Sequence, residues 1–179
     1  MSPVTRYFAW MYLRAFVWIV ICSLFLRRGT GNWKVVRAFF GAHLAALGFA
    51  VVTDVFLFAY APPRLLQIEV LQWIFTVPIV IFTIISLWIC NWEKPVKIPD
   101  VLITMLPLVL WGLLVIFGWQ WGMSECHVLG AWFSSAAAGA VDLYARYGPP
   151  AATRRPYATR LAGYAVVVLT VYLLLPRTQ

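Results

Sequence analysis

Apolar residues occur along this chain in long runs that are separated by short polar or basic segments. Each run approaches the roughly 20 residues that a helix needs to cross the hydrocarbon core of a membrane. The pattern predicts six spans: Tyr7–Leu26, Val36–Tyr60, Leu65–Asn91, Val101–Gly122, His127–Tyr144 and Arg160–Pro176. The run over 127–144 is short and rich in alanine, so five spans are the alternative. We therefore expect an all-α fold, a polytopic transmembrane helical bundle.

Composition agrees with this pattern. Of the 179 residues, 63% are hydrophobic and 11% are charged, whereas soluble domains carry about 25% charged residues. We expect one integral membrane domain over residues 1–179, with no room for a separate soluble domain. The first apolar run is too long for a signal peptide and lacks a small-residue cleavage site. In such a protein the net charge of +8 indicates basic cytoplasmic loops rather than nucleic-acid binding.

Basic residues are distributed unequally between the two predicted sides. The first, third and fifth loops hold ten of them: Arg27, Arg28, Lys34, Arg37, Lys94, Lys97, Arg146, Arg154, Arg155 and Arg160. The opposite side holds Arg6, Arg64 and Arg177. By the positive-inside rule these three loops are cytoplasmic and both termini lie outside or in the lumen. The endoplasmic reticulum and the bacterial inner membrane both fit this orientation.

One predicted span carries a polar stripe. Glu69, Gln72, Thr76 and Thr83 recur at i, i+3, i+7 and i+14, which places them on one face of a helix. An ionisable residue is costly in hydrocarbon and usually faces a bundle interior, a cavity or a ligand. The stripe predicts an intramembrane site, with Glu69 as a candidate acid and Gln72, Trp73 and Thr76 as ligand-binding residues.

Two further residues extend this candidate site. Asp54 and Glu69 lie near the outer ends of neighbouring antiparallel spans, both about 6–9 Å below the surface. If these two carboxyl groups meet in one pocket, one would be protonated and the other ionised, which suits acid–base catalysis. Separate hydration, or pairing with Arg64, is the alternative. His43 shares a helix face with Asp54 and lies about 16 Å from it along the helix axis. It is either a catalytic candidate or a hydrogen-bonded structural histidine.

Other charged or ligating residues have simpler interpretations. Arg14 either extends toward the membrane surface or neutralises a carboxylate inside the bundle. Asp142 and Arg146 are spaced i, i+4, which predicts an ion pair at a helix end. His43 and His127 fall near opposite faces and cannot ligate one haem. The three cysteines lack metal-ligand spacing, so neither a metal nor a cofactor is expected.

Several features lie at characteristic spacings between residues 29 and 115. Glu69 is followed nine residues later by Pro78, Gly31-Asn32-Trp33 precedes a span with His43-Leu44, and Asp54 is followed by Pro63-Arg64. In these features the chain resembles the emopamil-binding-protein and sterol-isomerase superfamily, called EXPERA. The resemblance implies a membrane-buried cavity for a sterol or isoprenoid-like ligand. Isomerising members pair a histidine with a glutamate one turn later, where this chain has Leu47.

We therefore expect a membrane pocket for a small apolar, sterol- or isoprenoid-like molecule. If the chain is an enzyme, we expect an isomerase or cyclase that protonates an alkene and then removes a proton from the product cation. Glu69 or Asp54 would be the acid, and Trp73 would stabilise the carbocation. The alternative is a non-enzymatic accessory subunit of a membrane complex or a small transporter. The expected partners are the lipid bilayer, the apolar ligand, and other membrane subunits or a second copy.

Overall fold

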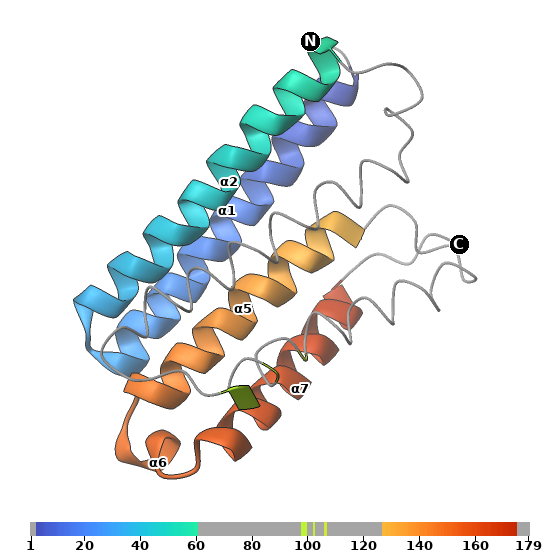
Figure 1. The fold of residues 1–179 in the computed structure, drawn as a ribbon. Helices are drawn as coiled ribbons and strands as arrows, with labels where there is room; N and C mark the ends of the chain where they lie inside the picture. The colour runs from blue at the N-terminus through green and yellow to red at the C-terminus, as the bar shows by residue number, and fades with distance from the viewer. Residues whose placement is uncertain (1–2, 61–97, 100–101, 103–105, 107–126, 175–179) are drawn as a thin grey trace.

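The computed structural model describes residues 3–60, 98–99, 102, 106 and 127–174, and all regular structure in these ranges is helical (Figure 1). The helices are α1 (Pro3–Thr30), α2 (Trp33–Tyr60), α5 (His127–Tyr147), α6 (Pro150–Thr153) and α7 (Pro156–Leu174). No strand occurs in these ranges. This confirms the all-α prediction for the described residues. The predicted span Leu65–Asn91, and nearly all of Val101–Gly122, lie outside them.

The long helices pack side by side (Figure 1). α1 and α2 form an antiparallel hairpin, α5 lies beside α1, and α7 packs on α5. The indole Nε1 of Trp18 donates to the carbonyl oxygen of Phe133 at 2.9 Å. Further along both helices, the rings of Phe25 and Tyr144 lie 5.4 Å apart. Because these contacts keep the same order, α1 and α5 are parallel, and their C-terminal ends share one end of the bundle.

Two residues make the tight turn between α1 and α2. Gly31 has a φ of 63°, a left-handed conformation that costs little without a Cβ, and its N–H donates to the carbonyl oxygen of Arg27. The Oδ1 atom of Asn32 then accepts from the N–H of Lys34 at 3.0 Å. This is the side-chain cap that a helix N-terminus requires. The hairpin is therefore encoded locally.

The core of the described bundle combines small residues with a few large ones. Its most buried apolar members include Ala15, Ile19, Leu26, Phe39, Ala136, Ala140 and Leu143. α5 supplies alanines where α1 and α2 supply the larger side chains, so helix axes can approach closely. The alanine-rich run, which was the weakest predicted span, is a continuous helix of 21 residues.

Large apolar side chains also cover the outside of the described bundle. Exposed members include Trp10 and Leu24 on α1, Phe56 on α2 and Leu169 on α7. Two helical segments in the described ranges, Ala9–Thr30 and Trp33–Thr53, are long and apolar enough to cross a membrane. These features are compatible with transmembrane helices.

Two helices extend beyond the predicted spans. α7 begins at Pro156 rather than at Arg160, because proline is well suited to the first helical position. Arg160, the first residue of the predicted span, therefore lies within α7. Arg27 and Arg28, which were assigned to the first loop, belong to the last turn of α1.

Candidate functional site

His43 is buried within the bundle on α2. Its Nδ1 lies 2.9 Å from the carbonyl oxygen of Phe39, one turn earlier. A carbonyl oxygen can only accept, so Nδ1 carries the hydrogen, and in the neutral ring Nε2 is a hydrogen-bond acceptor. Nε2 is buried and has no hydrogen-bond partner among the residues that the structure describes. One side of the imidazole is therefore fixed, and the other has unused hydrogen-bonding capacity.

Gly139 of α5 faces this imidazole. A Cβ placed on Gly139 would lie 3.4 Å from Cε2 of Phe39, 3.7 Å from Cε1 of His43 and 3.9 Å from Nε2 of His43. The ring centroids of Phe39 and His43 are 4.2 Å apart. His43 therefore lies in the interior of the described bundle, where α2 meets the small-residue segment of α5.

The structure describes only part of the rest of the predicted site. The backbone of Asp54 lies in α2, which continues without a break from His43, but its side chain lies outside the described structure. Glu69, Gln72, Trp73 and Thr76 all lie outside the described residues. The meeting of Asp54 with Glu69 therefore stays a prediction.

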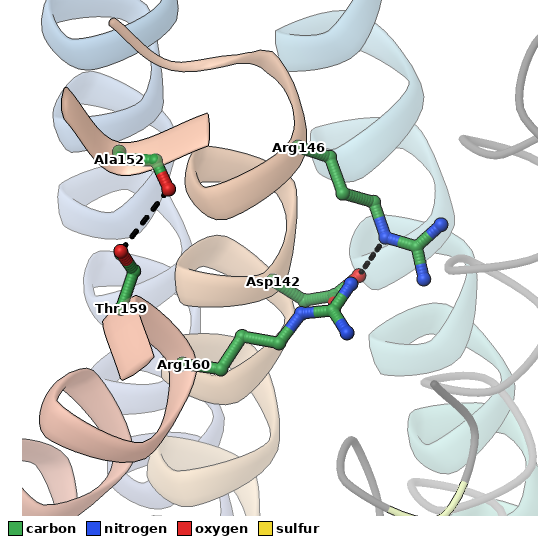
Figure 2. Close-up of polar contacts among 5 residues, drawn as sticks. All are labelled: Asp142, Arg146, Ala152, Thr159 and Arg160. Carbon is green, nitrogen blue, oxygen red and sulfur yellow. Dashed lines mark hydrogen bonds and ion pairs between the residues drawn. The ribbon is translucent and has the colours of Figure 1, made fainter. Parts of the chain in front are cut away.

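A buried ionic cluster joins α5 to α7. Figure 2 shows the Asp142 side chain beside the guanidinium groups of Arg146 and Arg160. Nε of Arg146 lies 3.1 Å from Oδ2 of Asp142, and Nε of Arg160 lies 2.7 Å from Oδ1. Asp142 and Arg160 are almost inaccessible to solvent. Nearby, the hydroxyl of Thr159 donates to the carbonyl oxygen of Ala152 at 3.1 Å (Figure 2).

The sequence predicted only half of this cluster. The i, i+4 pair of Asp142 and Arg146 is confirmed, but the contact between Arg160 and Asp142 was not predicted. The helix starts before Arg160, and the connection through α6 brings its side chain back to the depth of Asp142. A lone carboxylate in one span and a lone arginine early in the next were the signal that could have revealed the contact.

The ionic cluster has a structural role. Each carboxylate oxygen of Asp142 is within ion-pair distance of a guanidinium group, so the carboxylate is ionised and holds no proton to deliver. Asp142 therefore links α5 to α7, and His43 is the candidate for chemistry among the described residues.

Arg14 does not belong to this interior. Its side chain is exposed on α1, and its guanidinium carbon lies 5.6 Å from the ring centroid of Trp10. This arrangement supports the interpretation in which Arg14 extends toward the membrane surface. No cluster of three or more histidine, cysteine or acidic residues that could hold a metal occurs in the described part of the chain.

No protein-family model matches the chain, and no curated protein or solved structure matches it significantly.

Proposed function

We propose that this chain is a multi-pass membrane protein whose bundle holds a pocket for a small apolar, sterol- or isoprenoid-like molecule. The observation that carries the ligand part of the proposal is the unpartnered Nε2 of the buried His43. An unsatisfied buried polar atom costs about 1–3 kcal/mol. A ligand group that donates a hydrogen bond to this atom would remove that cost.

The membrane part of the proposal is supported by the outer surface. Exposed apolar side chains along α1, α2 and α7 would be unfavourable in water over so large an area and are ordinary against lipid. We propose six spans, of which α1, α2, α5 and α7 are the first, second, fifth and sixth.

The proposed orientation is supported by the charges at one end of the bundle. The α1–α2 turn and the α5–α7 connection lie at the same end (Figure 1). The exposed basic residues there are Arg27, Arg28, Lys34, Arg37, Arg154 and Arg155. We place this end in the cytoplasm.

For an enzymatic activity, we propose isomerisation or cyclisation. Glu69 or Asp54 would deliver a proton to an alkene carbon, and the π-face of Trp73 would stabilise the resulting carbocation. Loss of a neighbouring proton to the other carboxylate would form the new double bond and return the overall charge to its starting value.

Thermal unfolding of the purified chain tests this function. A saturating sterol or prenyl compound should stabilise it, by about 2.7 kcal/mol at 100 times the dissociation constant. An accessory subunit should instead be unstable alone and co-purify in a stoichiometric complex. Absence of stabilisation by any sterol or prenyl compound, together with such a complex, would overturn the pocket.

A further inference from the structure

The α1–α2 turn carries basic side chains at the edge of the exposed apolar surface. Arg27 and Arg28 in the last turn of α1, and Lys34 at the start of α2, are exposed. Leu24, which is 56% exposed, precedes Arg28 by four residues, so both lie on one face of α1. An apolar surface one helical turn from guanidinium groups matches the layout of a phospholipid, in which acyl chains adjoin a charged headgroup.

The two segments that form this end of the bundle contain no acidic residue. Residues 27–37 and 144–160 each hold four arginine or lysine residues and no aspartate or glutamate. The nearby carboxylate of Asp142 is buried and already paired with Arg146 and Arg160. Within these segments the exposed cations therefore have no carboxylate partner, and a bound anion would supply the counter-charge.

One of the exposed arginines is held in place by an aromatic ring. The guanidinium carbon of Arg27 lies 4.4 Å from the ring centroid of Trp33. Stacking uses the face of a guanidinium group and leaves the in-plane N–H groups able to donate to a phosphate. The last turn of α1 also lies close against α5, since a Cβ on Gly29 would be 2.6 Å from Cδ2 of Tyr144. Arg27 is therefore ordered at the surface before an anion binds.

These features exceed what membrane topology requires. The positive-inside rule needs positive charges in this part of the chain but no particular arrangement of them. Exposed leucine and tryptophan side chains beside the arginines suit a lipid, because tryptophan is typical of the membrane surface and a soluble anion offers nothing to apolar groups.

We propose that the α1–α2 turn binds the headgroup phosphate of an anionic phospholipid through Arg27 and Arg28. Trp33 is a positioning residue that holds Arg27, and Leu24 contacts the acyl chains. The proposal uses the membrane location argued above and is independent of the apolar pocket in the bundle interior.

Matched lipids test the headgroup. The full chain in dodecyl maltoside is titrated with dihexanoyl phosphatidylglycerol, with dihexanoyl phosphatidylcholine and with glycerol 3-phosphate, and affinity is read from thermal stabilisation. Phosphatidylglycerol should bind about fivefold or more tightly than phosphatidylcholine, the ratio that one basic residue contributes near an anionic lipid. Added salt should reduce this preference. Glycerol 3-phosphate, which carries the phosphate without acyl chains, should bind more weakly.

Variants assign the preference to the turn. Arg27→Gln should reduce it about fivefold. Trp33→Leu leaves the net charge unchanged but removes the ring under Arg27, and should reduce the preference about two- to fivefold. Arg154→Gln removes an exposed charge at the same end of the bundle, where no ring among the described residues holds it. It is the matched control and should reduce the preference less than twofold.

Four outcomes would overturn the headgroup site. They are equal binding of the two phospholipids, equal losses in Arg27→Gln and Arg154→Gln, glycerol 3-phosphate binding as tightly as phosphatidylglycerol, and tighter binding of a hexaglutamate peptide. The second would show diffuse attraction to net charge, the third a soluble phosphate ligand, and the fourth an acidic protein partner. Stabilisation by a sterol or prenyl compound is measured separately, so failure of the headgroup site leaves the pocket standing.

Discussion

Nε of Arg160 on α7 lies 2.7 Å from Oδ1 of Asp142 on α5, and both side chains are almost fully buried. A buried charge with its partner removed is strongly unfavourable, whereas the intact pair is tolerated. The pair therefore determines which face of α7 packs against α5. It also requires α7 to start before Arg160, because the residue must already lie on the helix face toward α5.

Asp142→Asn should lower the free energy of unfolding by about 3–5 kcal/mol, because the buried guanidinium groups of Arg146 and Arg160 would both lose the ion pair with this carboxylate. Reversible unfolding in mixed detergent and dodecyl sulfate measures the loss. The exposed Arg154→Gln is the control and should change stability by no more than about 0.5 kcal/mol. A similar loss in both variants would show that the cluster has no special role.

Gly163→Ala should destabilise the contact between α5 and α7. The added Cβ would lie 2.5 Å from Cγ1 of Val141, and a branched valine has little freedom to move away. We expect a loss of about 1–3 kcal/mol, and partial rescue when Val141→Ala is combined with it. The control Gly48→Ala has open space and should stabilise α2 by about 0.5–1 kcal/mol. Absence of rescue in the double variant would contradict this packing.

Gly31→Ala should weaken the α1–α2 hairpin by about 1–2 kcal/mol, because a residue with a Cβ is strained in the left-handed region. The φ of 63° at Gly31 is the cause, and nothing crowds its Cβ position. Gly31→Asn should cost less, since asparagine tolerates this conformation. Equal losses in the two variants, measured by the same unfolding assay, would rule out backbone strain as the cause.

The orientation predicts labelling by a membrane-impermeant maleimide. In a background with Cys22, Cys90 and Cys126 replaced, Lys34→Cys and Ala151→Cys should react only after the membrane is opened. Tyr60→Cys should react from the outside without opening. All three positions are exposed, whereas Ala152 is buried and unsuitable. Reaction of positions 34 and 151 in intact cells would reverse the topology.

Glu69→Gln should abolish a protonation-dependent activity while leaving the fold intact. Glutamine keeps the shape and the hydrogen bonding but holds no transferable proton. The activity is measured as isomerisation or cyclisation of a bound sterol or prenyl alkene, and folding is checked by the thermal midpoint. A folded variant with full activity would show that Glu69 is not the acid.

The elements of the described bundle follow largely from the sequence. The apolar runs over 7–26 and 36–60 became α1 and α2, because runs of this length and composition have few other stable forms. The turn between them at Gly31 and Asn32 is also local in origin, since a left-handed residue and a cap act within a few residues of the chain, but the sequence analysis did not predict it. The i, i+4 pair of Asp142 and Arg146 was likewise a local property of one helix.

Contacts between helices were decided only by the tertiary structure. Which face of α7 meets α5 depends on where the helix starts and on how Gly163 fits Val141, so no local pattern revealed that Arg160 reaches Asp142. The partner of His43 was equally hidden, because its surroundings combine Phe39, one turn away, with Gly139, nearly a hundred residues away. Periodicity determines which residues share a face, whereas side-chain packing between faces determines which buried polar atom is left to bind something else.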